Sequence, residues 1–262
     1  MSDATILCAV DPRGVATVTL NRPAIHNAFD DALIAELTRT LRRLEDDAGV
    51  RIVVLTGSGR SFSAGGDLNW MRRMAGYSEA ENLADAAALA ELMRVLNDLA
   101  KPTVARVNGA AFAGGLGLVA CCDIAIAAED AIFCISEVRL GLVPATIGPY
   151  VVAAIGARQS RRYFLTAERF SAAEARRIGL VHEVAPAAAL DAAVEEIVAA
   201  LLEGGAGAEA RSKRLIAEVQ DRVVTPSLQA LTARVIAEAR ASAEGREGLA
   251  AFFDKRDPAW RR

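Results

Sequence analysis

Two glycine-containing stretches about fifty residues apart place the strongest constraint on how this chain can fold. Residues 62–68 (FSAGGDL) and 108–117 (NGAAFAGGLG) each follow a short apolar run, at 51–56 and 103–107, and each lead into a helical pattern. Such strand-to-helix turns can present bare backbone N–H groups to one point, because glycine lets a ligand approach the backbone closely. Two convergent donors suit a carbonyl oxygen that gains negative charge during a reaction. The sequence therefore predicts an oxyanion hole built from two loops.

Composition excludes several other classes of protein. The 262 residues are 53% hydrophobic, which is enough for one large core, and the net charge of −3 gives no positive field that would favour nucleic acid or an anionic membrane. The two histidines lack H-E-x-x-H spacing and the four cysteines lack C-x-x-C spacing, so we expect free buried thiols and no metal site. The chain start shows no secretory signal pattern, and the apolar run at 110–122 is too short to span a bilayer, so we expect a cytoplasmic protein.

The order of the apolar patterns predicts an α/β fold. Strands are expected at 15–20, 52–55, 124–127 and 132–135, and helices at 30–44 and 79–99. This alternation is typical of layered structures with parallel strands. From residue 171 onward the patterns are helical, at 173–178, 190–202, 208–219 and 226–242. These helices are rich in alanine and cannot form much of a core alone, so we expect them to cover the main core or to pack against a neighbouring subunit.

Six motifs, in the order and at the spacing found here, resemble those of the crotonase superfamily, also called the enoyl-CoA hydratase/isomerase family. They are Asn21-Arg22-Pro23 with residues 27–29, the stretches at 62–68 and 108–117, residues 122–127, Ser136-Glu137 with Leu140, Gly141 and Pro144, and residues 251–256. The resemblance implies a spiral of ββα turns at 1–200 and a C-terminal helical region at 201–262. It also implies trimers that often pair into hexamers, with the C-terminal region contributing to trimerisation and to coenzyme A contact.

The resemblance assigns catalytic roles to three residues. The backbone N–H groups of Gly66 and Gly114 would stabilise a thioester enolate, and Glu137 would move a proton near the acyl carbons. Burial at the edge of a dry pocket would raise the pKa of such a carboxyl toward neutrality. Without the resemblance, the glycines could serve only as tight turns, and Glu137 could be a solvated loop charge.

One position departs from the well-known hydratases of this family. Those enzymes carry a second glutamate three residues after the oxyanion-hole glycine, where this chain has Gly117, and the two carboxylates together hold the water that is added. Asp67 is expected to cap a helix and Asp123 to anchor a strand start, so neither is an obvious replacement. The missing carboxylate puts two-glutamate hydration in doubt, and it would suit an acyl chain that bears its own carboxylate.

Finer likeness points to one kind of substrate. The stretches at 66–71, 117–123 and 136–142 look similar to bacterial methylglutaconyl-CoA hydratases of leucine catabolism, whose substrates are branched enoyl thioesters with a terminal carboxylate. Arg72, Arg73 or Arg139 could pair with that carboxylate, although each could equally be a solvated surface charge.

The resemblance also implies a set of residues that bind the coenzyme A ester, with no other cofactor. Lysine suits a nucleotide phosphate as a point charge, and the C-terminal motif commonly reaches the nucleotide across a subunit boundary. The set comprises Asn27, Ala28, Ala64, Asp67, Leu68, Gly117, Leu140, Pro144, Phe252 and Lys255.

The sequence therefore predicts a lyase that adds water to an α,β-unsaturated acyl-CoA, with 3-methylglutaconyl-CoA as a model substrate. Two alternatives stay open: a Δ3-Δ2-enoyl-CoA isomerase that uses the single glutamate, and a non-catalytic acyl-CoA-binding protein. A serine hydrolase is disfavoured because no G-x-S-x-G elbow is present, and a P-loop enzyme because no G-x-x-x-x-G-K-[ST] is present.

Overall fold

The structure is a computed structural model that describes residues 4–261. The first three residues, Met1 to Asp3, belong to the chain start on which the expectation about a secretory signal was based, and they lie outside the described residues. Within the described part, no helix combines the length and the apolar character that a membrane crossing requires.

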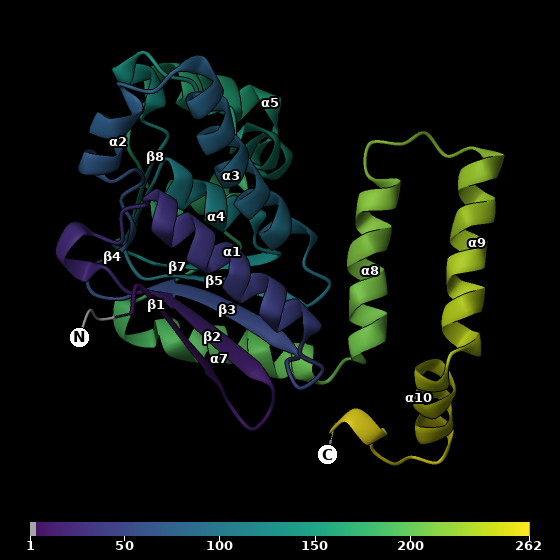
Figure 1. Ribbon diagram of the computed structural model, residues 1–262. Helices are drawn as coiled ribbons and strands as arrows, with labels where there is room; N and C mark the ends of the chain where they lie inside the picture. The colour runs from purple at the N-terminus through teal and green to yellow at the C-terminus, as the bar shows by residue number, and fades with distance from the viewer. Residues whose placement is uncertain (1–3, 262) are drawn as a thin grey trace.

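Two sheets, built in alternation, form the core of the molecule (Figure 1). The larger sheet has the order β1-β2-β3-β5-β7-β10, and only β1 and β2 pair antiparallel. The smaller sheet has the order β4-β6-β8-β9, with β9 antiparallel to β8. The strands are β1 (Ile6–Val10), β2 (Val15–Leu20), β3 (Ile52–Gly57), β4 (Ser61–Ser63), β5 (Thr103–Val107), β6 (Ala110–Phe112), β7 (Ile124–Ala128), β8 (Ile132–Cys134), β9 (Phe170–Ser171) and β10 (Glu183–Ala185).

The chain winds as a spiral, which confirms the predicted fold class. Each turn places one strand in the larger sheet, the next strand in the smaller sheet, and then a helix: β3, β4 and α2; β5, β6 and α4; β7, β8 and α5. The helices of this part are α1 (Asp31–Asp46), α2 (Leu68–Met74), α3 (Glu79–Asp98), α4 (Gly114–Cys121), α5 (Gly148–Thr166), α6 (Ala172–Ile178) and α7 (Leu190–Leu202).

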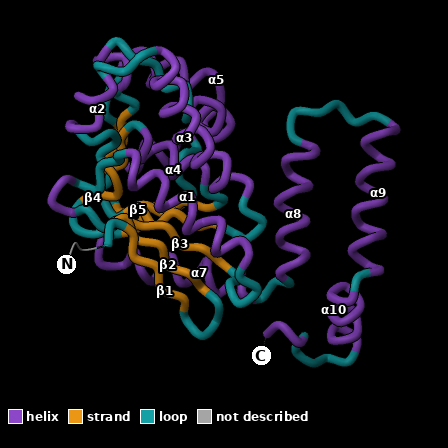
Figure 2. The backbone as a smooth tube through the Cα atoms, viewed as in Figure 1, coloured by secondary structure: helices purple, strands orange, loops and turns teal. Residues whose placement is uncertain are grey.

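Helices cover both faces of the larger sheet (Figure 2). Along β3, Val53 and Leu55 face the core beneath α1 and α3, whereas Ile52 and Val54 face the core beneath α7. A parallel strand that is buried on both faces reads as a continuous apolar run, which is how the sequence presents β3. The predicted apolar stripe of α1, from Leu33 to Leu44, is buried in the first of these cores.

The last three helices form an arm that stands beside the core (Figure 1). They are α8 (Ala206–Val219), α9 (Pro226–Ala241) and α10 (Ala243–Phe253). The arm buries few side chains: none of α8, Leu228 and Val235 of α9, and Ala251 of α10. From the sequence we expected these helices either to cover the main core or to pack against a neighbouring subunit. The arm does not cover the core of its own chain.

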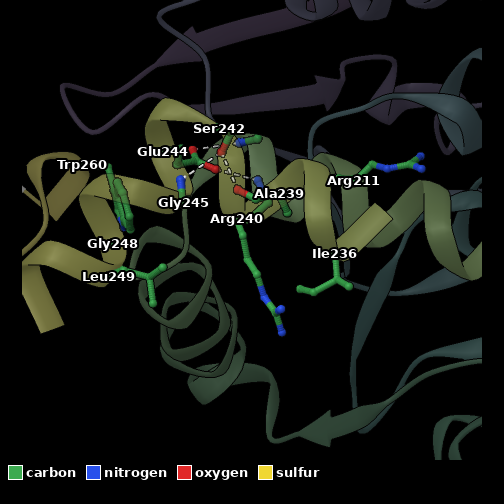
Figure 3. A pocket seen from close by; sticks show the side chains of 13 residues that line it. Arg211, Ile236, Ala239, Arg240, Ser242, Glu244, Gly245, Gly248, Leu249 and Trp260 are labelled. Atoms are coloured by element: carbon green, nitrogen blue, oxygen red, sulfur yellow. Dashed lines mark hydrogen bonds between the residues drawn. The ribbon is translucent and has the colours of Figure 1, made fainter. Parts of the chain in front are cut away.

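A cavity of about 650 Å³ opens between the helices of the arm (Figure 3). Ile236, Leu249 and Trp260 give it apolar walls, and the Glu244 carboxylate accepts hydrogen bonds from the N–H groups of Gly207 and Ala208 at the start of α8. The arm is thus held together by local capping and leaves apolar surface open.

The cysteines are free, as expected. Cys121, Cys122 and Cys134 are buried and Cys8 is half-buried. Burial raises the pKa of the Cys122 thiol to about 12, so this sulfur stays protonated at neutral pH. The thiols therefore act as small apolar groups in the core.

Candidate active site

The three residues predicted to be catalytic follow three neighbouring parallel strands. Strands β4, β6 and β8 lie side by side and end at Ser63, Phe112 and Cys134, and Gly66, Gly114 and Glu137 come two or three residues later. The carboxyl ends of parallel strands meet at one edge of a sheet, where α/β proteins commonly bind ligands. The fold therefore brings all three residues to the same edge.

The two glycine loops touch each other through Phe29. The Phe29 N–H donates to the Gly65 carbonyl (2.7 Å), and a Cβ atom at position 114 would lie 2.9 Å from Cε2 of the Phe29 ring. Position 114 therefore requires glycine for packing. At position 66, a Cβ atom would meet nothing closer than the Met71 side chain at 3.4 Å. Glycine at 66 is not demanded by the protein's own packing, which fits a role in leaving room for a ligand.

Both predicted donors have unused N–H groups. Within residues 4–261, neither the Gly66 N–H nor the Gly114 N–H donates to an acceptor. Gly114 is the first residue of α4, where helix geometry leaves N–H groups without intrahelical partners and concentrates positive potential. Ala113 precedes it with a φ of 47°, an unusual conformation for alanine, and donates its own N–H to the Cys134 carbonyl (2.9 Å). Strain of this kind often accompanies a functional site.

Glu137 supplies the one carboxyl group predicted to react. It begins a short 3-10 helix (Glu137–Leu140) soon after β8, and in the described part of the chain its buried Oε2 has no hydrogen-bond partner. Burial raises the pKa of Glu137 above its ordinary value of 4.5, and hydrogen bonds from the backbone N–H groups of Glu137 and Ser136 offset only part of this effect. A carboxyl with a raised pKa and a free oxygen is suited to exchange protons with a bound substrate.

Ile147, which the sequence reasoning missed, occupies the space beside Gly117. A Cβ atom at position 117 would lie 2.2 Å from Cγ2 of Ile147 and 2.9 Å from its Cβ. Ile147 is buried just before α5, which packs against α4. A glutamate at position 117 would therefore have no room unless α5 moved. No sequence signal pairs these residues, because they lie thirty positions apart in different elements.

The predicted coenzyme A residues of the core gather beside Gly66. Asn27 is fully buried, and its amide donates to the carbonyls of Ser58 (2.9 Å) and Ser61 (2.8 Å). Because this side chain is used within the protein, any contact of Asn27 with coenzyme A must come through its backbone. The Ala64 N–H donates to the His26 carbonyl, and Leu68 is 70% exposed at the start of α2.

Asp67 is a helix cap, as the sequence predicts. Its Oδ1 accepts from the N–H groups of Asn69 (2.8 Å) and Trp70 (3.2 Å) in the first turn of α2. Ala28 is buried on the facing segment, next to Phe29. Asp67 and Ala28 therefore belong to the frame that supports the first glycine loop.

The remaining predicted binding residues fall into two places. Pro144 is buried and Leu140 is 59% exposed in the segment after Glu137. Phe252 is 77% exposed and Lys255 is also exposed. Phe252 belongs to α10 and Lys255 follows that helix, and α10 lies away from α2 and β4 (Figure 1). The structure thus brings the core residues together and leaves the two arm residues apart from them within one chain.

Comparison with known proteins identifies the family to which this chain belongs. The model of the enoyl-CoA hydratase/isomerase family matches residues 11–262. The chain belongs to the enoyl-CoA hydratase/isomerase family. It is 45% identical to an enoyl-CoA hydratase of Shewanella pealeana of known crystal structure, with a TM-score of 0.95 over 98% of this chain and 96% of that one. The family's enzymes act on acyl-CoA thioesters, so this chain is an enzyme of the enoyl-CoA hydratase type.

Two further relatives show the range of names within the family. A Rhodobacter capsulatus protein named as a probable enoyl-CoA hydratase is 35% identical over 94% of this chain and 93% of its own length. A hydroxycinnamoyl-CoA hydratase-lyase of Pseudomonas fluorescens is 37% identical over 72% of this chain and 70% of its own length. The reaction of this chain must therefore be argued from its own site.

Replacing Glu137 with glutamine is expected to stabilise the protein while it removes the carboxylate predicted to react. The pKa of Glu137 is higher in the folded protein than its ordinary value of 4.5, so the folded state holds this proton more tightly than the unfolded state does. The free energy of unfolding therefore falls as the pH rises from 4.5 to the folded-state pKa. Glu137→Gln should raise this free energy by about 1 kcal/mol at neutral pH. At pH values near 4 the gain should vanish, because the carboxyl is then protonated in both states.

Urea denaturation at several pH values measures this difference. Glu129→Gln, in the exposed turn after β7, is the matched control and should leave the free energy of unfolding unchanged at every pH tested. A gain that is the same at all pH values would contradict the assignment of a desolvated carboxylate at position 137.

Proposed function

We propose that the protein adds water to an α,β-unsaturated acyl-CoA that is branched and carries a carboxylate, with 3-methylglutaconyl-CoA as the model substrate. The observation that carries the proposal is the buried, unpartnered Oε2 of Glu137 at the same sheet edge as two unused backbone N–H groups. One proton-transfer group and two convergent donors are the parts that enolate chemistry on a thioester requires.

The proposed reaction needs only these groups. The thioester oxygen binds between the N–H groups of Gly66 and Gly114, which stabilise the negative charge of the enolate; one such donor is commonly worth about 3 kcal/mol. Glu137, as the carboxylate, takes a proton from a water molecule while the water oxygen bonds to the β-carbon. The enolate then collapses and its α-carbon takes that proton back from Glu137. The net result is addition of H and OH across the double bond.

The region beside Glu137 supports a negatively charged acyl chain. Ile147 fills the space next to Gly117, so no second carboxylate of the protein would repel that of the substrate. Of the three candidate arginines, Arg72 bonds to Asn69 and Arg73 pairs with Asp31. Arg139 is exposed, and within the described residues its guanidinium has no hydrogen-bond or ion-pair partner. Because it lies on the same 3-10 helix as Glu137, we assign the recognition of the substrate carboxylate to Arg139.

The Ile147 side chain also supports a second candidate function. Where two-glutamate hydratases hold water between carboxylates, this chain presents an apolar group. A dry site with one carboxyl can move a proton from one carbon of the acyl chain to another, which is the reaction of a Δ3-Δ2-enoyl-CoA isomerase. Non-catalytic binding of acyl-CoA is the third outcome that the experiment below distinguishes.

We also propose that the cytoplasmic protein works as a homotrimer or as a hexamer made of two trimers. The arm buries little of its own apolar surface, and contiguous exposed apolar surface marks an interaction site. Helix α10 stands apart from α2 in Figure 1, so we assign Phe252 and Lys255, at the end of α10, to the coenzyme A bound by a neighbouring subunit.

This assembly predicts a trimer or larger species in sedimentation velocity at micromolar concentration. Truncation before α8 should yield a smaller species. A full-length chain that sediments as a monomer would contradict the assignment.

Turnover in oxygen-18 water separates the three candidate reactions. We expect 3-methylglutaconyl-CoA to give a labelled hydroxyacyl-CoA faster than crotonyl-CoA does, and Glu137→Gln to lower kcat by about 10² to 10⁴-fold, since general acid–base catalysis contributes that much. Mass spectrometry of the products measures the label. Unlabelled migration of the double bond in a 3-enoyl-CoA would establish the isomerase instead, and tight binding without turnover would establish the binding protein.

Arg139→Gln tests how the substrate is recognised. The change should raise KM for 3-methylglutaconyl-CoA by about tenfold and leave crotonyl-CoA unaffected, because a solvent-accessible charge pair contributes about 1 kcal/mol or somewhat more when partly desolvated. Arg72→Gln is the matched control, since it removes another exposed arginine of the three candidates, one that already bonds to Asn69. Equal effects on both substrates would show that Arg139 does not contact the acyl carboxylate.

A further inference from the structure

Arg22 lies at the centre of a polar cluster that no reaction step uses. It follows β2, and its side chain is only 19% exposed. Its Nη1 donates to the Ala28 carbonyl (2.8 Å) and pairs with Oδ2 of Asp30 (2.9 Å), and its Nη2 pairs with Oδ2 of Asp67 (3.3 Å). One guanidinium thus joins three points on two separate segments.

Both carboxylates that Arg22 contacts are helix caps. Asp30 accepts from the Leu33 N–H (2.8 Å) with its Oδ1 at the start of α1. Asp67 uses its Oδ1 in the same way at the start of α2. Each carboxylate therefore gives one oxygen to a helix and the other to Arg22. The guanidinium fixes the start of α2 relative to the start of α1.

The Gly66 N–H lies inside this frame. The Phe29 N–H donates to the Gly65 carbonyl, and the Asp67 N–H donates to the Phe29 carbonyl, each at 2.7 Å. These two backbone bonds flank Gly66 and leave its own N–H free. The bond from the Arg22 side chain to Asp67 holds the residue that follows Gly66, so a shift of Asp67 would turn the Gly66 N–H.

Removal of Arg22 should disturb this frame by electrostatics as well as by lost contacts. Asp30 and Asp67 both face the guanidinium and both are partly buried, Asp67 more so than Asp30. Without the guanidinium, the two carboxylates would repel each other. Lysine restores the charge but, as a compact point charge, cannot repeat the three-point geometry of the guanidinium.

We infer that Arg22 is a positioning residue that aims the Gly66 N–H at the thioester oxygen. The inference rests on the oxyanion role proposed for Gly66. Arg22 does not touch the substrate, and its effect passes through Asp67. Since a donor stabilises the enolate more than the ground-state thioester, misalignment should act on kcat more than on KM.

Kinetics of Arg22→Gln and Arg22→Lys test the inference on the full-length protein. We expect kcat for crotonyl-CoA to fall by about 10 to 100-fold in the glutamine variant, because a misplaced group can reduce the rate that much, with KM changed less than about threefold. The lysine variant should recover part of the loss. Arg13→Gln is the matched control: Arg13 also pairs with two carboxylates, Asp11 and Glu195, but lies between β1 and β2 and should leave kcat unchanged.

Infrared spectroscopy of a bound 13C-labelled thioester gives a second readout that a loss of stability alone would not move. In the unsubstituted protein the carbonyl stretch should shift to lower frequency on binding, because two donors polarise the bond. The shift should be smaller in Arg22→Gln and intermediate in Arg22→Lys. If the glutamine variant does not fold, the lysine variant carries both tests.

The outcomes distinguish this inference from the proposed function. If the unsubstituted protein neither turns over an enoyl-CoA nor shifts the carbonyl stretch, the proposed function fails. If it does both and the Arg22 variants keep its kcat and its shift, Arg22 has only a structural role and the inference is overturned. A rise in KM with unchanged kcat would instead show that Arg22 contacts the substrate.

Discussion

Parallel pairing of β4, β6 and β8 is the constraint on which the site depends. These strands have only three residues each, and they pair because longer strands β3, β5 and β7 pair in the same order in the larger sheet. Every turn of the spiral therefore ends at the same sheet edge and adds one predicted catalytic residue there: first Gly66, then Gly114, then Glu137. The proposed chemistry follows from this repeated strand order, and the apolar runs that bury the larger sheet hold the three residues in register.

The site keeps groups in states that a core would avoid. Among residues 4–261, the N–H groups of Gly66 and Gly114 find no acceptor and the buried Oε2 of Glu137 finds no hydrogen-bond partner, and Ala113 has a positive φ. Each of these features is unfavourable by about 1–3 kcal/mol in the absence of a ligand. A rigid surrounding is needed to maintain them, and the Phe29 backbone, the capped start of α2 and the β8 carbonyl at Cys134 provide it. A bound thioester would satisfy the donors that the empty fold leaves unused.

The sequence predicted the large elements well because their apolar patterns are long. The stripe of α1 and the continuous run of β3 could each be recognised without knowledge of their partners. Of the smaller sheet, only β8 was predicted, as a strand at 132–135. Strands β4, β6 and β9 were not recognised, since strands of two or three residues have no measurable period. Motifs nominate Glu137 and the two glycines, and the fold brings these three residues to one sheet edge. For Asn27, the motif could not reveal that the side-chain amide bonds to Ser58 and Ser61, which leaves only its backbone for a contact with coenzyme A. Ile147 lies beside Gly117 and Arg22 contacts Asp67, and only the fold reveals these contacts because the partners are distant in sequence.

Gly117 and Ile147 are best understood as one feature of the site. A glycine alone would leave a hole where other hydratases have a carboxylate, and such a hole in a polar site would admit water. The methyl group of Ile147 fills that volume and makes it apolar. In the proposed reaction, Glu137 then handles both the proton that leaves the water and the proton that reaches the α-carbon, so its pKa has to suit both steps. Burial without a charged partner raises that pKa, which is the direction that lets one carboxyl act first as a base and then as an acid.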